Sequence, residues 1–225
     1  MQKLNLGCGP VQPAGWINTD GSLRAWVASR LSWLDWLMVR LRIWPLTEFS
    51  RQTRFVQLHK RFPWPDNSAD CVYLGEVLEH FTREDGMRLL AECFRVLKPG
   101  GVLRCRVPDN AEFWRNYLRD FDKSHSRPRS EWSLDHSRWV QMFFRDICVR
   151  RRWVGSYGHY HKWMYDEISL IRTFEQIGFV AVERRQFLDS AIPDVAAVET
   201  RDDLIVEGTK PPAPAQESLP AERRS

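Results

Sequence analysis

The sequence predicts an α/β fold built on a mostly parallel sheet, and three observations support this prediction. Strand-like segments alternate with helical patterns along most of the 225 residues. A glycine turn, Gly7-Cys8-Gly9, directly follows the first strand-like segment, and an acidic residue, Asp20, ends the second. Alternation of this kind implies parallel strands, which bind ligands at their carboxyl ends.

The first part of the chain contains three short strand-like segments and one long helical pattern. Residues 3–6 and 16–19 form the first two predicted strands, and residues 54–58 form the third. Between them, apolar residues recur every three or four positions over residues 23–44, which predicts a helix that Pro45 stops. We therefore expect residues 22–52 to carry one long helix rich in tryptophan.

The middle of the chain repeats the strand–helix–strand pattern. Residues 70–74 are apolar enough for a buried strand. Thr82 is a suitable N-cap with Asp85 at the third helical position, and Lys98-Pro99-Gly100-Gly101 is typical of a helix end. A strand is expected over residues 102–107.

The remainder combines an insertion with a return to the sheet. Residues 110–160 are basic and aromatic and are expected to form a helical insertion after the fifth strand. Asp166 and Gly178 bracket a further helix, followed by strands near residues 179–184 and 204–208. Residues 210–225 have the composition of a disordered tail.

The composition is that of a globular protein, with 43% hydrophobic and 28% charged residues and 11 tryptophans. A net charge of +4 does not by itself identify a nucleic-acid-binding protein. No apolar stretch is long enough to span a bilayer, and the N-terminus does not resemble a signal peptide. We expect a cytoplasmic protein, with contact to the inner face of the membrane left open.

The cysteines predict neither disulfides nor a zinc site, because they are scattered and never form a CxxC pair. We expect them to be reduced and mostly buried, and we expect no metal. They are Cys8, Cys71, Cys93, Cys105 and Cys148.

The glycine turn and Asp20 together indicate a nucleoside ligand. Glycines there let backbone amides approach a ligand closely, although the third glycine of the GxGxxG dinucleotide pattern is missing. A carboxylate at the end of the second strand can accept hydrogen bonds from both ribose hydroxyls. The alternative for Asp20 is an N-cap of the helix that follows.

A third group of motifs adds specificity: residues 65–73 (PDNSADCVY), 76–81 (EVLEHF) and 95–101 (RVLKPGG). With the glycine turn, Asp20 and these motifs in this order, the chain resembles the class I S-adenosylmethionine-dependent methyltransferases, and most closely the type 11 methyltransferase domain. The resemblance covers about residues 3–107 and resumes weakly over residues 159–210.

The resemblance implies a methyltransferase domain over residues 1–209 with a Rossmann-like, seven-stranded sheet whose last strand is antiparallel. It also implies S-adenosylmethionine as cofactor: the glycine turn would contact its methionine part, Asp20 the ribose, residues 57–58 the adenine, and residues 75–77 the sulfonium end. The residues so implied are Asn5, Gly7, Cys8, Gly9, Asp20, Gln57, Leu58, Gly75, Glu76 and Val77.

Two departures from the family pattern stand out. About six residues separate Gly9 from Trp16, too few for the usual crossover helix, so its N-terminal dipole is missing or weakened. Gln57 stands where the family often has an acidic residue near the adenine amino group, although its side-chain oxygen can still accept that hydrogen bond.

Methyl transfer to a hydroxyl benefits from a general base. The candidate catalytic residues are His80, His161, His159 and Asp109, of which His80 and His161 rank first; His136 is a further histidine to consider. His80 and Asp109 follow strands at the ligand-binding edge. For each histidine, a hydrogen-bonded packing role is the alternative.

The tryptophan-rich helix and the insertion indicate the class of acceptor. The helix, with arginines among its tryptophans, either covers the sheet or lies on an anionic membrane through residues 23–44. The insertion suits a glycan, a lipid-linked molecule or another anionic small molecule.

An RNA methyltransferase is an alternative, although no RNA-binding module is recognisable. A non-catalytic binding protein that retains the fold is another.

Overall fold

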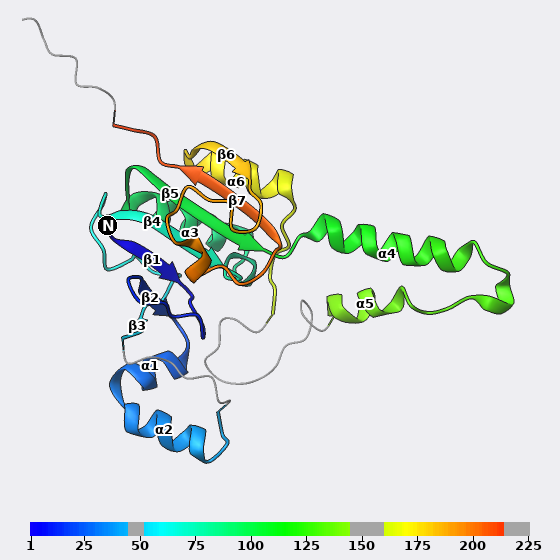
Figure 1. The fold of residues 1–225 in the computed structure, drawn as a ribbon, viewed down its shortest axis with the longest axis horizontal. Coiled ribbons are helices and arrows are strands. Elements are labelled where there is room, and N and C mark those ends of the chain that lie inside the picture. The colour runs from blue at the N-terminus through cyan, green and yellow to red at the C-terminus, as the bar shows by residue number, and fades with distance from the viewer. Residues whose placement is uncertain (45–51, 145–159, 214–225) are drawn as a thin grey trace, which may run out of the picture.

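A seven-stranded sheet forms the centre of the molecule in a computed structural model that describes residues 1–44, 52–144 and 160–213. The strands are β1 (Lys3–Leu6), β2 (Ile17–Asp20), β3 (Arg54–Phe55), β4 (Ala69–Gly75), β5 (Leu97–Val107), β6 (Val180–Arg184) and β7 (Leu204–Thr209). Their order is β3-β2-β1-β4-β5-β7-β6 (Figure 1). β7 runs antiparallel to β5 and β6, and the pairs from β3 to β5 are parallel. The predicted seven-stranded sheet with an antiparallel last strand is confirmed.

Six helices accompany the sheet in the described part of the chain: α1 (Leu23–Arg30), α2 (Ser32–Arg40), α3 (Arg83–Val96), α4 (Asn110–His125), α5 (Ser137–Phe143) and α6 (Glu167–Ile177). The predicted caps at Thr82, Asp166 and Gly178 are confirmed. The predicted helix end at residues 98–101 is wrong, because α3 ends at Val96 and these residues already belong to β5. Thr82 Oγ1 accepts a hydrogen bond from the Asp85 amide at 3.2 Å, and Asp166 caps α6, which ends at Gly178 in the left-handed conformation.

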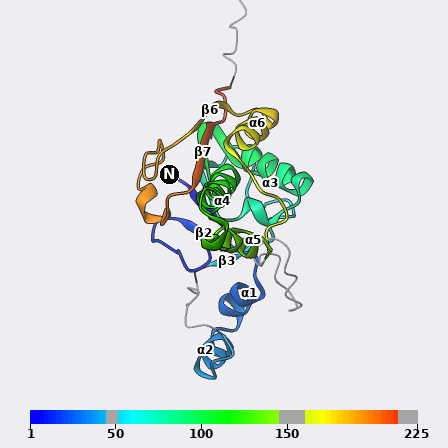
Figure 2. The same cartoon turned by 90° about the vertical axis from the view of Figure 1, so that its right-hand side faces the viewer.

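The two faces of the sheet are covered differently. Figure 2 shows α3 and α6 on one side, where they bury the main apolar core, including Leu90, Leu170 and Phe174. The other side is covered by the segment between β6 and β7, which includes the short 3₁₀ turn η4 (Val195–Ala197). Val195 packs there against a second cluster that includes Trp16.

The predicted single helix over residues 22–52 is wrong, because the chain leaves the helical conformation at Leu31 (φ −133°, ψ 55°) and a second helix, α2, begins at Ser32. Arg24 Nε donates to Asp35 Oδ1 at 3.3 Å, and both side chains are largely buried. In one continuous helix these residues would be roughly 16 Å apart along the axis, at about 1.5 Å per residue. The ion pair therefore requires the break. Residues 45–51, including Pro45, lie outside the described residues.

The expected helical insertion begins as a helical hairpin that projects from the sheet (Figure 1). α4 follows β5 directly, and α5 returns along it after the 3₁₀ turn η2 (Arg129–Glu131). The remainder of the expected insertion, including Cys148, the basic run at residues 150–152 and His159, lies outside the described residues.

The chain stays ordered for slightly longer than the predicted domain boundary at residue 209. Lys210, expected to open the disordered tail, donates from Nζ to the carbonyl oxygens of Phe94 and Leu97 at 2.8 Å each. Residues 214–225 lie outside the described residues. Within the described ranges, every helix is too short or too polar to cross a bilayer.

Candidate active site

The glycine turn after β1 has a backbone that favours glycine. Gly7 and Gly9 have φ values of +68° and +50°, in the left-handed region. A β-carbon on Gly7 would lie 2.5 Å from Cγ2 of Val77, whereas one on Gly9 would meet no described atom within 4 Å. The turn is therefore closed on the Val77 side and open beside Gly9, where a ligand can approach the backbone.

The connection from β1 to β2 contains no helix, as its length predicted. Side-chain hydrogen bonds hold it instead: Asn5 Nδ2 donates to the Val11 carbonyl at 2.8 Å and to Asn18 Oδ1 at 3.0 Å. Within the turn, burial raises the pKa of Cys8 to about 12. Cys8 is therefore a neutral thiol at physiological pH.

Asp20 lies at the end of β2 and faces the glycine turn. Its Oδ2 accepts the Gly9 amide at 3.2 Å, and its Oδ1 accepts the Ser22 amide at 2.8 Å. The N-cap of α1 is Ser22, whose Oγ accepts the Ala25 amide, so the alternative of Asp20 as the cap is wrong. Each carboxylate oxygen retains a second lone pair for a ligand hydroxyl.

The residues expected at the adenine lie beside Asp20. The Val56 amide donates to the Asp20 carbonyl at 3.2 Å. A β-carbon on Gly21 would lie 3.9 Å from the α-carbon of Gln57. Gln57 is half-buried and Leu58 is buried, so a polar and an apolar residue follow β3 at the same edge as Asp20.

Residues 75–77 close the candidate cofactor site from the end of β4. Glu76 has a φ of +55°, an uncommon conformation for a residue with a side chain. Its Oε1 accepts hydrogen bonds from Arg106 Nη1 at 3.0 Å and Arg201 Nη1 at 3.2 Å. At Gly75, a β-carbon would lie 2.7 Å from the Tyr73 ring. This turn is thus held by two arginines and packed closely.

His80 and His161 are brought together although they are far apart in sequence. Their ring centroids are 5.1 Å apart, in an edge-to-face arrangement. His80 belongs to the 3₁₀ turn η1 (Leu78–His80), which follows the Gly75–Val77 turn, and its Nδ1 lies 3.2 Å from the Tyr160 carbonyl oxygen. The two histidines ranked first from the sequence therefore form one cluster.

Glu79, beside this pair, is a residue that the sequence interpretation did not select. It is 1% exposed, and neither carboxylate oxygen has a hydrogen-bond partner among the described residues. Burial raises the pKa of Glu79 to about 8. Its signal in the sequence was a carboxylate directly after the buried Leu78, in a segment otherwise apolar enough for the core.

Asp109 caps α4: its Oδ1 accepts the amides of Ala111 at 2.9 Å and Glu112 at 3.2 Å. Its Oδ2 lies 3.3 Å from Arg184 Nη1. These contacts give Asp109 a structural role at the start of the hairpin.

A buried ion cluster on β5 was likewise not predicted from the sequence. Arg104 is fully buried and binds Glu199 Oε2 at 2.6 Å and Glu207 Oε1 at 2.8 Å. Its guanidinium also donates to the carbonyls of Gln186 and Asp189, at 3.0 and 2.7 Å. An arginine inside a strand-like run is the only sequence signal, and its partners lie about 100 residues away. The cluster fixes the segment between β6 and β7 to the sheet.

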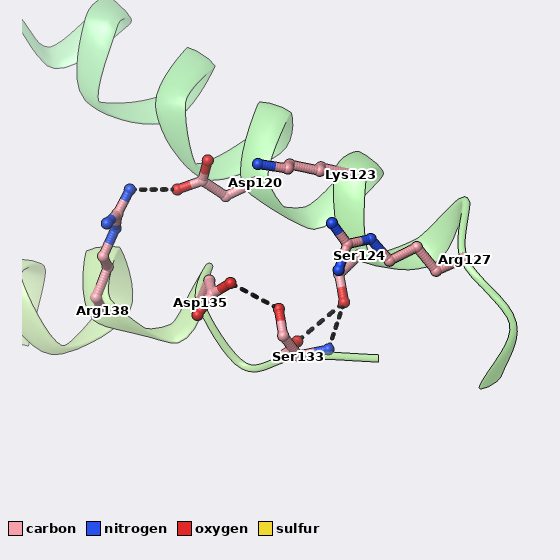
Figure 3. A pocket seen from close by; sticks show the side chains of 7 residues that line it. All are labelled: Asp120, Lys123, Ser124, Arg127, Ser133, Asp135 and Arg138. Carbon is pink, nitrogen blue, oxygen red and sulfur yellow. Dashed lines mark hydrogen bonds and ion pairs between the residues drawn. The ribbon is translucent and has the colours of Figure 1, made fainter. Parts of the chain in front are cut away.

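A polar pocket of about 180 Å³ lies between α4 and the chain that leads into α5 (Figure 3). Asp120 Oδ2 accepts a hydrogen bond from Arg138 Nη2 at 2.7 Å, and Lys123 and Arg127 add positive charge. His136, at the start of α5, contacts the rings of Tyr117 and Phe121. The pocket belongs to the region expected to meet the acceptor, and it contains none of the candidate catalytic residues.

Comparison with known proteins shows which domain the first half of the chain resembles. Residues 4–105 match the model of a methyltransferase domain. A Mycolicibacterium smegmatis protein described as a "probable S-adenosylmethionine-dependent methyltransferase" is 43% identical over 51 residues, which are 23% of this chain and 19% of that protein. A demethylmenaquinone methyltransferase of Listeria welshimeri is 34% identical over 95 residues, 38% of this chain and 37% of that protein. The chain thus spans well under half the length of these relatives.

Solved structures share the fold at low sequence identity. A methyltransferase of Thermotoga maritima superposes with a TM-score of 0.51 at 15% identity, covering 93% of this chain and 82% of that chain. A methyltransferase of Archaeoglobus fulgidus superposes with a TM-score of 0.50 at 14% identity, covering 93% of this chain and 86% of that chain.

The matched methyltransferase domain implies S-adenosylmethionine as cofactor, and the residues present fit it. The open side of Gly9 admits a ligand to the backbone, the Asp20 carboxylate retains lone pairs for hydroxyls, and Gln57 lies at the same edge. Together with the seven-stranded sheet, this fit agrees with the match of residues 4–105 to a methyltransferase domain. Over these residues the chain is similar to the class I S-adenosylmethionine-dependent methyltransferases.

Proposed function

We propose that this protein transfers a methyl group from S-adenosylmethionine to an anionic small molecule, either a glycan or a lipid-linked compound. The observation that carries the proposal is the convergence of the glycine turn, Asp20 and the His80–His161 pair at one edge of the sheet. Gly7 contacts Val77, and η1 follows Val77 directly, so the cofactor turn and the histidine pair are joined by a short piece of chain.

The cofactor, when bound, supplies a methyl group already activated on a sulfonium, so the protein mainly aligns the nucleophile and excludes water. In this proposal, the backbone of residues 7–9 binds the methionine part and Asp20 accepts hydrogen bonds from the ribose hydroxyls. Gln57 and Leu58 contact the adenine, and Gly75, Glu76 and Val77 cover the sulfonium end. Asn5 keeps the turn in place through its bonds to Val11 and Asn18.

The side chains of the helical hairpin formed by α4 and α5 favour an anionic acceptor. Trp114 and Phe121 on α4 are 40% and 39% exposed. Lys123, Arg127 and Arg138 line the polar pocket close by. Aromatic and cationic side chains on one projecting element suit a ligand that has both an apolar or sugar part and a negative charge.

For a hydroxyl acceptor, His80 and His161 are the candidate bases. The Tyr160 carbonyl can only accept a hydrogen bond, so His80 Nδ1 carries the proton and the neutral ring has its lone pair on Nε2. A ring in this tautomer can accept a proton from an acceptor hydroxyl. His159 and Asp109 remain predictions, the first because it lies outside the described residues.

The Listeria relatives are named for demethylmenaquinone, but the match covers 38% of this chain, so the acceptor of this protein has to be found by experiment. Purified protein is incubated with S-adenosylmethionine carrying a tritiated methyl group and with separate lipid, glycan and RNA fractions of cell extract. We expect label in a lipid or glycan fraction, and no label with Asp20→Ala. Label confined to nuclease-sensitive material would identify an RNA methyltransferase instead. No label in any fraction from folded protein would contradict the proposed activity.

A further inference from the structure

Three side chains that can bind a metal lie together beside the proposed cofactor site. Glu79, His80 and His161 each offer a donor atom, and these atoms all lie within 4.8 Å of one another. Two of the residues come from η1 and the third from the segment that precedes α6. The tertiary fold, and not local sequence, therefore assembles the cluster.

The Glu79 carboxylate is the strongest sign that something binds there. Both of its oxygens are buried, and neither has a hydrogen-bond partner in the described part of the chain. Buried polar groups in folded proteins nearly always have partners, because an unsatisfied one costs free energy, and a charged one costs more. A bound cation would satisfy both oxygens at once.

His80 is held in the way that metal-ligating histidines usually are. A ligating histidine commonly donates its second ring N–H to a backbone carbonyl, which fixes the ring and its tautomer. His80 Nδ1 makes this contact with the Tyr160 carbonyl at 3.2 Å. The segment that carries His161 is fixed to the third ligand, since the amides of Lys162 and Trp163 donate to the Glu79 carbonyl at 2.7 and 3.2 Å.

We propose that Glu79, His80 and His161 bind one divalent transition-metal ion of the zinc type. Two imidazoles and one carboxylate are a ligand set that zinc uses in catalytic sites, where the fourth position stays open. Hard ions such as magnesium prefer sites made only of oxygens. Donor atoms around a tetrahedral zinc are roughly 3.4 Å apart, given bonds of about 2.0–2.1 Å, so small side-chain rotations would close the site.

This inference rests on the proposed function and assigns the site a task within it. A divalent ion lowers the pKa of a hydroxyl bound at its open position. The acceptor oxygen then forms its bond to the methyl carbon while the carbon–sulfur bond breaks. The products are the methyl ether, S-adenosylhomocysteine and one proton released to water. In this arrangement the bound ion replaces His80 and His161 as the group that activates the acceptor hydroxyl, because their ring nitrogens bind the ion.

The test uses full-length protein stripped with a chelator and then titrated with Zn²⁺ by calorimetry and with Co²⁺ by visible absorption. S-adenosylmethionine is titrated into the same samples. Glu79→Gln and His161→Ala each remove one ligand, and His125→Ala removes a histidine of α4 outside the cluster. Circular dichroism checks that each variant is folded.

We expect one metal ion per chain and a d–d spectrum without a thiolate charge-transfer band. Each ligand variant should bind at least about tenfold more weakly, since even losing an outer-shell partner costs roughly 10–100-fold, and His125→Ala should bind like the parent protein. No stoichiometric metal binding, a thiolate band, or affinity unchanged in both ligand variants would overturn the site. If the protein binds S-adenosylmethionine but no metal, the metal site is contradicted and the methyltransferase proposal stands. If the protein binds the metal but no S-adenosylmethionine, the proposed function is contradicted and the metal site stands.

Discussion

Cγ2 of Val77 lies 2.5 Å from the point where a β-carbon on Gly7 would be. This contact joins the turn after β1 to the turn after β4, the two turns that are proposed to enclose the cofactor. Any side chain at position 7 has to separate them. The shape of the site thus depends on the absence of a side chain at Gly7 as much as on the polar residues around it.

Gly7→Ala should lower the affinity for S-adenosylmethionine by about tenfold or more, which corresponds to roughly 1.4 kcal/mol. The alanine meets Val77 and also has to adopt a left-handed backbone, at a cost of roughly 1–2 kcal/mol. Isothermal titration calorimetry measures the affinity.

Gly100→Ala is the matched control, because Gly100 has a φ of +80° but a β-carbon added there would meet no described atom within 4 Å. It should lose a similar amount of stability to backbone strain and keep its cofactor affinity. Equal effects of both variants on affinity would show that the Val77 contact does not shape the site.

Asp20→Ala should abolish detectable cofactor binding while the protein remains folded. The variant removes the proposed ribose acceptor and also the acceptor of the Gly9 amide, at 3.2 Å. Ser22→Ala removes only the cap of α1, so it should cost about 1 kcal/mol of stability and leave the affinity unchanged. Undiminished affinity in folded Asp20→Ala protein would contradict the placement of the ribose.

Arg104→Met should destabilise the fold by roughly 3–5 kcal/mol, because it leaves Glu199 buried without a cation and Glu207 with only Arg185, at 3.7 Å. Urea denaturation followed by fluorescence measures the free energy of unfolding. Arg172→Met removes an arginine that is 74% exposed and paired with Glu175, so it should change stability by less than about 0.5 kcal/mol. Similar results for the two variants would contradict the structural role of the Arg104 cluster.

The exposed tryptophans of α2 predict binding to anionic membranes. Trp33 and Trp36 are 65% and 62% exposed, and the Arg40 guanidinium lies 5.5 Å from the Trp36 ring centre. Aromatic and basic residues on one surface suit the membrane interface. Sedimentation with phosphatidylglycerol vesicles should recover the parent protein, and a Trp33→Ala, Trp36→Ala double variant should stay in solution.

The control is Trp132→Ala, because Trp132 is 51% exposed but lies on the hairpin between α4 and α5. It should bind vesicles like the parent protein. If the parent protein fails to bind anionic vesicles, or binds neutral phosphatidylcholine equally well, the membrane prediction is wrong.

The sheet could be predicted from the sequence because its signals are local. Thr82 with Asp85, and Asp166 with Gly178, mark helix ends within a few residues of chain. The absence of a helix between β1 and β2 followed from length alone. His80 and His161 could be selected from the sequence as the first candidate bases, but the contact between their rings was not predicted, and their chemical role stays a prediction.

Features that depend on distant partners could not be predicted. The break at Leu31 forms with the Arg24–Asp35 pair, and the apolar periodicity on either side continues as if the helix were whole. Glu79 resembles any carboxylate next to a helix until the fold buries it beside His161. The absence of a metal site was predicted from cysteine spacing, a criterion that does not detect ligands from glutamate and histidine.

The central claim is that residues 7–9, Asp20 and Gln57 form a site for S-adenosylmethionine. Calorimetric titration of the purified protein with S-adenosylmethionine and with S-adenosylhomocysteine tests it most directly. The account predicts saturable binding of one ligand per chain with micromolar affinity. Binding of neither ligand by well-folded protein would contradict it and would favour a protein that retains the fold without the cofactor.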